Sequence, residues 1–360
     1  MATLKSKIFN KIVRELNALG VFTPVRQLEH FQGHGKYKLL IIAPGELEIP
    51  TGGWGAVETI ISETIPEYIS NGFSVTLLNS KNRKDWRRAA KNKYDVLLCH
   101  SDNLGPLVHR YFPAVPSVAI SHYGYAAYKN MWHASYQTTL IGLENFSKIC
   151  CLAPNIEQTL KQEFPGWQTF ISSNGSSFKT EIQSHGKPML DAYACIGKVE
   201  ERKGQFDLYR RFKKSPVKIH FLGDIKDPRV EELVKSDVLA RESFVGPRSR
   251  EWLRDNLSRY RGLLLLSKGE ADALVLYEAQ LAGLPIFVTK EALGAQDEKL
   301  PWVRVVSYDL DADELVQEAA SVVTTKEVIA DFAQKNYRWG IRNKNLTNHL
   351  YQMASEGEVN

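Results

Sequence analysis

Short apolar runs recur along the whole chain, separated by longer stretches in which apolar residues return at helical spacing. This alternation is typical of parallel sheets built from strand–helix–strand units. The pattern predicts two series of strands, each long enough for one doubly wound domain. The first series covers 38–43, 74–79, 95–100, 117–122 and 148–152, and the second covers 192–197, 217–223, 262–267, 284–288 and 303–307.

The polar stretch 179–188, which contains Gly and Pro, separates the two series and predicts a linker. We therefore expect an N-terminal Rossmann-like domain over 1–180 and a C-terminal one over 188–336. Two such α/β domains facing one another imply a cleft, which is where folds of this kind bind ligands.

The composition excludes several classes of protein. Of the 360 residues, 43% are hydrophobic and 24% are charged, which is ordinary for a globular chain and rules out disorder and collagen. The four cysteines show no CxxC spacing, so we expect a reducing compartment and no structural metal. The longest uncharged apolar run, 279–289, is too short to span a bilayer, and residues 1–20 lack the pattern of a signal peptide. These features predict a cytoplasmic protein.

The segment before the first strand has apolar residues at helical spacing with basic residues between them. Two interpretations are open: a helix packed on its own domain, or a helix that binds a membrane surface or a partner. The apolar positions are Leu4, Ile8, Ile12, Leu16 and Leu19.

A glycine-rich loop, 52–55 (GGWG), joins the first strand to the following helix. Glycines at such a turn let the backbone approach a ligand, and the start of a helix favours negative charge. The spacing differs from GxGxxG, and no acidic residue clearly follows the second strand, so a dinucleotide site is not indicated. A turn needed only for tight packing is the alternative.

Two loops of the second series carry charge. The loop after strand 192–197 holds Lys198 and Lys203, which could neutralise a diphosphate, although a solvated basic loop is the alternative. After strand 262–267, Glu270 and Glu278 flank the start of a predicted helix. Free backbone N–H groups near 273–275 would lie between these carboxylates and could receive phosphate oxygens, while the carboxylates bind sugar and ribose hydroxyls.

These elements together resemble the retaining GT-B glycosyltransferases of family four, which include phosphatidylinositol mannosyltransferases and sucrose-phosphate synthases. The family's E-x7-E, GR-x4-KG, Asn-Gly, glycine-loop and strand-end histidine elements appear in the family's order between residue 38 and about residue 290. No single element is specific, but the combination is. The matching residues are Glu270 and Glu278, Gly197-Lys198 and Lys203-Gly204, Asn174-Gly175, 52–55, and His122.

The resemblance implies roles for individual side chains. Lys198 and Lys203 would stabilise the departing diphosphate, which is the main electrostatic demand of glycosyl transfer. Glu270 would orient the donor sugar without acting as a nucleophile, and Glu278 would hold the ribose hydroxyls. His122 would lie near the donor sugar, with a histidine merely bonded to backbone as the alternative. The catalytic set is thus His122, Glu270 and Lys203.

The resemblance also implies a mechanism and a set of partners. The leaving phosphate would accept the acceptor's proton on the same face, so that configuration is retained without a covalent intermediate. No metal or other cofactor is implied, and the co-substrate would be a nucleotide-diphosphate sugar, with UDP or GDP favoured. A terminal helix at about 337–360 would pack back on the first domain. Backbone amides of the donor site would be those of Gly52, Gly53, Ala273, Leu274 and Val275.

Two departures from the family pattern affect this prediction. The usual arginine is Lys198, which keeps the charge but loses bidentate contact with phosphate. The usual Phe-Gly pair is Asp272-Ala273, which we expect to put an extra carboxylate beside the sugar and to remove the glycine at the phosphate turn. A catalytically silent nucleotide-sugar-binding protein is therefore an alternative to an active transferase. A GT-B epimerase or phosphorylase is a third interpretation, and no lysine is placed to anchor pyridoxal.

The stretch 81–93 carries seven basic residues against one acid. A solvated helix face is one interpretation, and an anionic membrane surface with a lipid-linked acceptor, which implies peripheral membrane association, is another. A polyanionic acceptor or nucleic acid, as for a glycosyltransferase that acts on nucleic acid, is the third, although aromatic residues are not interleaved with the charges as a stacking platform needs. The aromatic stretch 123–136 is expected to shape the acceptor pocket. The predicted acceptor or membrane residues are Lys84, Trp86, Arg87, Arg88 and Lys91.

The sequence 309–313 (DLDAD) contains a DxD pair, which holds a divalent metal in other glycosyltransferases. Here it follows the last predicted strand and opens a helical stretch, so acidic residues at a helix start explain it better.

Overall fold

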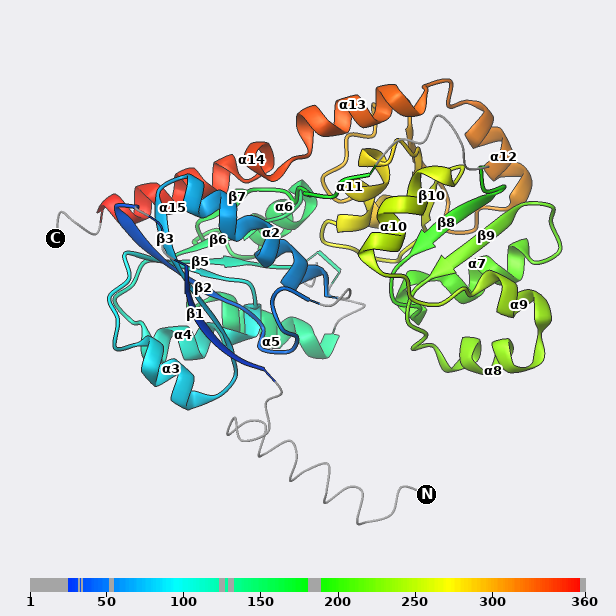
Figure 1. Ribbon diagram of the computed structural model, residues 1–360. Coiled ribbons are helices and arrows are strands. Elements are labelled where there is room, and N and C mark those ends of the chain that lie inside the picture. The colour runs from blue at the N-terminus through cyan, green and yellow to red at the C-terminus, as the bar shows by residue number, and fades with distance from the viewer. Residues whose placement is uncertain are drawn as a thin grey trace, which may run out of the picture. The chain divides into compact units, whose positions relative to one another are not determined.

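The chain divides into two compact units, the first comprising Met1–Ser172 and Asn343–Asn360 and the second Ser173–Arg342. Both are layered α/β structures, as the sequence pattern predicts (Figure 1). In this computed structural model the structure is described for residues 25–31, 33, 35–51, 55–122, 127–128, 133–180 and 189–356. The amphipathic segment 4–19, most of the predicted linker and residues Gly52 and Gly53 lie outside these ranges.

The first unit holds a seven-stranded sheet in the order β1-β3-β2-β4-β5-β6-β7. The sequence pattern does not predict β1 (Arg26–Phe31), because this antiparallel edge strand is polar and half-exposed, nor the three-residue β7 (Thr169–Ile171). The predicted strands are confirmed, and from β2 to β7 the sheet is parallel. They are β2 (Tyr37–Ile42), β3 (Phe73–Ser80), β4 (Val96–Cys99), β5 (Ser117–Ile120) and β6 (Lys148–Cys151).

Helices follow most strands of this sheet and cover it (Figure 1). The last helix, α15, packs within this unit, since the Tyr351 ring meets the Phe73 ring edge-on at 4.7 Å. The helices are α2 (Ala56–Ser70), α3 (Arg83–Ala89), the short 3-10 turn η1 (Asp102–Leu104), α4 (Gly105–Tyr111), α5 (His133–Leu143), α6 (Pro154–Glu163) and α15 (Lys344–Glu356).

The second unit holds a five-stranded parallel sheet in the order β12-β11-β10-β8-β9. All five strands are predicted from the sequence. Alternate residues of β8 enter two separate apolar cores, one with Ala194 and the other with Cys195, so helices pack on both faces. The strands are β8 (Ala192–Ile196), β9 (Lys218–Leu222), β10 (Leu263–Leu265), β11 (Ile286–Val288) and β12 (Val303–Val305).

The helices of the second unit connect these strands or follow the last of them (Figure 1). They are η2 (Glu201–Lys203), α7 (Gln205–Phe212), α8 (Pro228–Ser236), α9 (Val238–Ser243), α10 (Arg250–Asn256), η3 (Leu257–Arg259), α11 (Leu274–Leu281), η4 (Lys290–Ala292), α12 (Ala312–Ala320), α13 (Lys326–Asn336) and α14 (Trp339–Arg342).

The predicted boundaries at residues 180 and 337 both fall inside the second unit. The reason is local bonding. Phe178 is buried in one of the second unit's cores, and its carbonyl accepts a hydrogen bond from Arg338 at 2.8 Å. Gly175 is approached so closely by Tyr337 that a Cβ there would lie 2.8 Å from the Tyr337 carbonyl oxygen.

Each sheet reverses its strand order beside an interior strand. In the first unit β2 lies between β3 and β4, and in the second unit β8 lies between β9 and β10. Open α/β sheets bind ligands at such a switch point, outside the carboxyl ends of the strands. The loops that leave β2, β4, β8 and β10 are therefore the first places to look for a site.

Candidate active site

Two loops of the second unit meet outside its switch point. One follows β8 and runs from Gly197 to Gly204, and the other follows β10 and leads into α11. Because β8 and β10 are neighbouring parallel strands, both loops leave the same edge of the sheet. The backbone N–H of Lys268 donates to the Arg202 carbonyl at 2.9 Å and joins the two loops.

Glu270 is held by two basic residues of the first loop. Its Oε1 accepts a hydrogen bond from Nη1 of Arg202 at 2.9 Å and lies 3.3 Å from Nζ of Lys203. Only 12% of the Glu270 side chain and 14% of the Lys203 side chain are exposed. Burial acts to raise the pKa of Glu270, but the charges of Lys203 and Arg202 outweigh it and hold that pKa below its usual value. Glu270 is therefore an ionised carboxylate at the switch point.

Arg202 is a site residue to which the sequence analysis assigns no role. Its Nη2 donates to Glu200 at 2.7 Å, and its Nη1 donates to Glu270 and to the Gly269 carbonyl. It therefore bridges the two loops. In the sequence Arg202 is only one more basic residue beside Lys203. The pattern does not show which of these two side chains reaches Glu270 on the other loop.

Glycines allow the loops at the switch point to pack closely against one another. Gly197 has a φ of 137°, and a Cβ there would lie 3.0 Å from Nζ of Lys203, whose side chain crosses this residue. A Cβ on Gly223, in the loop after β9, would lie 1.9 Å from the Gly197 carbonyl oxygen. Lys198 is exposed, and Gln205 donates to its carbonyl at 3.0 Å.

Helix α11 begins in the same loop as Glu270. Its N-cap residue, Ala273, has an extended backbone and offers no side-chain cap. The first N–H groups of a helix have no partner within the helix and carry partial positive charge. The amides of Leu274 and Val275 therefore form a place where an anion would be stabilised, on the loop that carries Glu270.

Glu278 lies one turn inside α11 and is buried. Its Oε1 accepts a hydrogen bond from Nη1 of Arg250, in α10, at 2.6 Å. The guanidinium of Arg250 also stands over the Phe178 ring at 5.5 Å. Glu278 is thus a fixed carboxylate, and Arg250 is a second residue of the region that the sequence analysis does not single out.

The expectation that Asp272 adds a carboxylate beside the sugar is wrong. Asp272 is buried and turned into the protein, where Oδ2 accepts from the Asn174 N–H at 2.8 Å and Oδ1 from the Ala295 N–H at 3.2 Å. The Tyr277 hydroxyl is within 2.9 Å of both oxygens. Burial raises the pKa of Asp272 to about 6, although these donors oppose it. Asp272 joins three segments of the second unit and is structural.

His122 belongs to the first unit, two residues beyond β5. Its Nε2 lies 2.9 Å from Nδ1 of His100, which follows β4, so this ring nitrogen has a side-chain partner. Burial lowers the pKa of His122 to about 4. The ring is therefore neutral at neutral pH.

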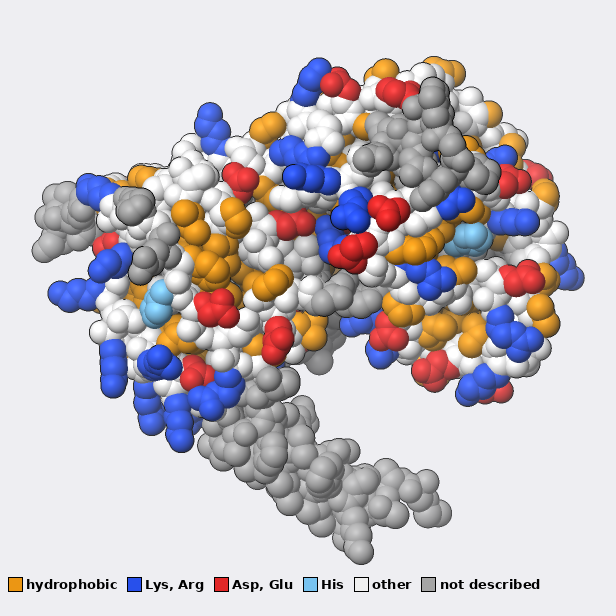
Figure 2. Space-filling view, in the orientation of Figure 1, with side chains coloured by type: hydrophobic (Ala, Val, Ile, Leu, Met, Phe, Trp, Pro, Cys, Tyr) orange, Lys and Arg blue, Asp and Glu red, His pale blue; other side chains and the backbone are white. Residues whose placement is uncertain are grey.

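The basic stretch forms α3 and the turns around it. Lys84, Arg87, Arg88 and Lys91 are exposed, and Figure 2 shows Lys and Arg side chains gathered over this part of the first unit. The helix itself spans only Arg83–Ala89, so Lys91 lies beyond its end rather than on one continuous helical face.

The expectation that Trp86 contacts an acceptor or a membrane is wrong. Trp86 has no exposed surface, and its indole N–H donates to the Ser80 carbonyl at 2.7 Å. It belongs to an apolar core with Leu78 and Phe112. The single acid of the stretch, Asp85, likewise faces inward and pairs with Arg26 of β1 at 2.8 Å. The outward surface is therefore more strongly basic than the sequence alone suggests.

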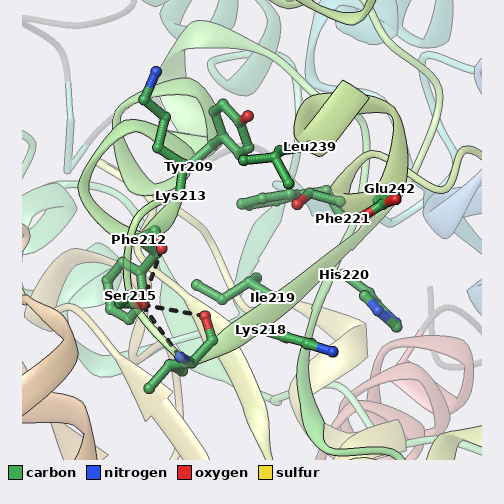
Figure 3. Close-up of a pocket in the computed structure, with 12 residues that line it drawn as sticks. Tyr209, Phe212, Lys213, Ser215, Lys218, Ile219, His220, Phe221, Leu239 and Glu242 are labelled. Atoms are coloured by element: carbon green, nitrogen blue, oxygen red, sulfur yellow. Dashed lines mark hydrogen bonds between the residues drawn. The ribbon is translucent and has the colours of Figure 1, made fainter. Parts of the chain in front are cut away.

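A cavity of about 260 Å³ lies elsewhere in the second unit, between β9 and the helices α7 and α9 (Figure 3). Tyr209, Phe221 and Leu239 give it apolar walls, while Ser215 at its edge is bonded to the backbone of Phe212 and Val217. None of the predicted site residues lines it. The loops at the switch point, which hold Glu270 and Lys203, therefore remain the better candidate.

The DxD pair has the structural role that its position predicts. Asp311 is the N-cap of α12, where its side chain accepts from the Glu314 N–H at 2.9 Å, and the Glu314 side chain accepts from the Asp311 N–H at 3.0 Å. Over the part of the chain whose structure is described, no group of His, Cys, Asp and Glu residues could hold a metal ion. Within those same residues, no helix is long and apolar enough to cross a membrane.

Comparison with solved structures identifies the fold. Sucrose-phosphate synthase from Thermosynechococcus elongatus superposes with a TM-score of 0.70, covering 89% of this chain and 100% of its own, at 13% identity. AviGT4, a glycosyltransferase involved in avilamycin A biosynthesis, gives 0.64 at 13% identity over 89% of this chain and 98% of its own. The fold is that of the GT-B glycosyltransferases.

A third GT-B structure was determined with a nucleotide sugar. HepE from Anabaena, in complex with UDP-glucose, gives a TM-score of 0.59 at 14% identity, covering 89% of this chain and 98% of its own. No protein-family model matches the sequence, and no curated protein matches it. The comparisons therefore establish the GT-B fold, and the chemistry is argued from the residues of the site.

Proposed function

We propose that this chain is a glycosyltransferase that moves a sugar from a nucleotide-diphosphate donor to a hydroxyl acceptor. The observation that carries the proposal is the pair formed by Lys203 and Glu270 at the switch point of the second sheet, beside the uncapped start of α11. A cation and a free helix N-terminus suit a diphosphate, and a fixed carboxylate suits sugar hydroxyls. HepE, whose fold is similar, was solved with UDP-glucose.

In this proposal each residue acts on one part of the donor. Lys203 and the amides of Leu274 and Val275 stabilise the diphosphate as it leaves with growing negative charge. Glu270 orients the sugar hydroxyls, and the salt bridges with Lys203 and Arg202 keep it ionised. Lys203 therefore has two tasks, since its ammonium group also balances the charge of Glu270.

The ribose is assigned to Glu278, whose carboxylate Arg250 holds in place. We propose retention of configuration, as the resemblance to family four implies, with the acceptor's proton passing to the leaving phosphate on the same face. No metal has a role in this scheme. The favoured donors are UDP- and GDP-sugars.

The exposed cations around α3 support an anionic partner for the first unit. We propose that Lys84, Arg87, Arg88 and Lys91 bind an anionic membrane surface that carries the acceptor, each contributing about 1 kcal/mol near acidic lipid. The location that follows is the cytoplasmic face of a membrane. Of the two features that favour a catalytically silent protein, the Asp272 carboxylate is bonded inside the second unit, whereas Ala273 still stands where the family has a glycine.

The test is a panel of UDP-, GDP-, ADP- and dTDP-sugars, with thermal shift and donor hydrolysis as readouts. We expect one donor to raise the melting temperature and to release its sugar slowly. Glu270→Gln should lower the hydrolysis rate, and Asp255→Asn, which changes an exposed acid of α10, is the matched control. Absence of binding or hydrolysis with every donor would overturn the proposal.

A further inference from the structure

Two histidines of the first unit lie side by side at the carboxyl edge of its sheet. His100 follows β4 directly, and its backbone N–H donates to the Ile42 carbonyl of β2 at 2.8 Å. His122 follows the neighbouring parallel strand, β5. The family resemblance points to His122 alone and assigns nothing to His100.

The two imidazole rings meet edge to edge. Nδ1 of His100 lies 2.9 Å from Nε2 of His122, whereas the ring centroids are 5.1 Å apart and the planes differ by 13°. Since the nitrogens are far closer than the centroids, the contact is a nearly in-plane N–H···N hydrogen bond rather than a face-to-face stack. One of the two nitrogens must donate and the other must accept.

Both rings are neutral at neutral pH. Burial lowers the pKa of His100 well below its usual value, and the neighbouring His122 lowers it further. Burial lowers the pKa of His122 to about 4. Each ring therefore carries one proton, and the direction of the hydrogen bond fixes where both protons lie.

The surroundings of His100 decide that direction. Its Nε2 is buried and meets no hydrogen-bond partner among the residues whose structure is described. A proton on this Nε2 would be a buried N–H without an acceptor. Buried donors without a partner are rarer in proteins than buried acceptors without one. The proton is better placed on Nδ1, where Nε2 of His122 accepts it.

We infer that His100 is a positioning residue that holds His122 in the tautomer with its proton on Nδ1. Within the described part of the chain, no group accepts a hydrogen bond from this N–H. It is therefore available to a ligand oxygen. This inference rests on the proposed function, in which that oxygen belongs to a hydroxyl group of a substrate. His122 then acts as a hydrogen-bond donor and not as a general base, because His100 occupies its basic nitrogen.

The test uses the full chain with ¹⁵N-labelled histidine. Two-bond ¹H–¹⁵N NMR spectra distinguish protonated from bare ring nitrogens, and His122→Gln assigns the signals. His100→Asn places an amide N–H₂ near the former Nδ1 and can still donate, whereas His100→Phe keeps a flat ring without a donor. We expect a bare Nε2 on His122 in the wild type and in His100→Asn, and a mixture of tautomers in His100→Phe.

The second readout is hydrolysis of the donor that the nucleotide-sugar panel selects. His100→Phe should lower kcat about tenfold or more, with a smaller change in KM, and His100→Asn should restore the rate. A protonated Nε2 on His122 in the wild type overturns the inference, as does a wild-type kcat in His100→Phe. If the wild type hydrolyses no donor, the proposed function fails, and the NMR spectra still decide the tautomer.

Discussion

The backbone N–H of Asn174 donates to the Asp272 carboxylate at 2.8 Å, and the Asn174 side-chain amide donates to the Asp272 carbonyl at 2.7 Å. These two hydrogen bonds tie the segment that opens the second unit to the loop that carries Glu270. Arg342, the last residue of that unit, reaches the same cluster through Tyr277, whose ring its guanidinium approaches at 5.4 Å. Asp272 therefore anchors both ends of the second unit next to the proposed donor site.

The buried state of Asp272 predicts a dependence of stability on pH. Because burial raises the pKa of Asp272 to about 6, the folded protein keeps a proton at pH values where the unfolded carboxyl, with a pKa of about 4, has lost it. The stability from this group is present in full below about pH 4 and is lost as pH rises through about 6. The loss amounts to about 3 kcal/mol at most.

Asp272→Asn cannot ionise and isolates this effect. Between pH 4 and pH 7 the free energy of unfolding of the wild type should fall relative to that of Asp272→Asn, as measured by calorimetric melting of the full chain. Asp255→Asn serves as the control, since it removes an exposed acid. Parallel pH profiles of the wild type and Asp272→Asn would contradict the prediction.

Lys203→Met should separate catalysis from folding. The variant removes the charge that faces Glu270 at 3.3 Å but keeps the aliphatic stem that crosses Gly197. We expect donor hydrolysis to fall about a hundredfold, as when one electrostatic stabiliser of a transition state is removed. The melting temperature should fall much less, because Arg202 still pairs with Glu270. Lys268→Met, on the neighbouring loop but exposed, is the matched control. A matching loss of rate and melting temperature would mean that Lys203 is structural.

Substitution of Trp86 should lower the stability of the fold, whereas substitution of its basic neighbours should not. Trp86→Ala empties a fully buried site and should cost about 3–5 kcal/mol of stability. Replacing the exposed Arg87 and Arg88 by Ser should leave the free energy of unfolding nearly unchanged. Chemical denaturation of the three proteins provides the measurement. A small effect of Trp86→Ala would place this side chain at the surface after all.

The same basic surface predicts binding to acidic lipid. Vesicles containing phosphatidylserine should pull down the wild type at low salt, and the binding should weaken as salt screens the charges. A variant in which Lys84, Arg87, Arg88 and Lys91 are replaced by Ser should remain in solution. Neutral phosphatidylcholine vesicles are the control. Absence of binding to acidic vesicles at low salt would exclude the membrane interpretation.

Trp86 and Asp272 show that the direction of a single side chain could not be predicted from the sequence. The apolar runs predict the strands because a buried strand must be apolar whatever surrounds it, and from their order the loops after β8 and β10 can be assigned to one site. The direction of a single side chain depends on other segments. Trp86 turns inward because the backbone of Ser80 offers an acceptor, and Asp272 turns inward because Asn174 and Ala295, far apart in sequence, offer donors.

His100 shows a different limit. A histidine at a strand end has no distinctive spacing, so the sequence does not connect it with His122, 22 residues away. The sheet brings them together because β4 and β5 are neighbours with a fixed register, in which Cys99 is paired with Ala119. Strand order can be anticipated for a doubly wound fold, but the contact between two ring nitrogens requires side-chain geometry.

Gly223 offers a test of the loop architecture itself. A Cβ at this position would lie 1.9 Å from the carbonyl oxygen of Gly197 and 2.6 Å from the Gly197 carbonyl carbon, both backbone atoms that cannot turn aside. Gly223→Ala should therefore displace the loop that carries Lys203, lowering donor binding and the melting temperature together. Gly166→Ala is the matched control, since no atom lies within 4 Å of its added methyl group. Thermal shift with and without the selected donor measures both effects. If Gly223→Ala binds the donor and melts like Gly166→Ala, the close approach of the loops after β8 and β9 is not needed for the site.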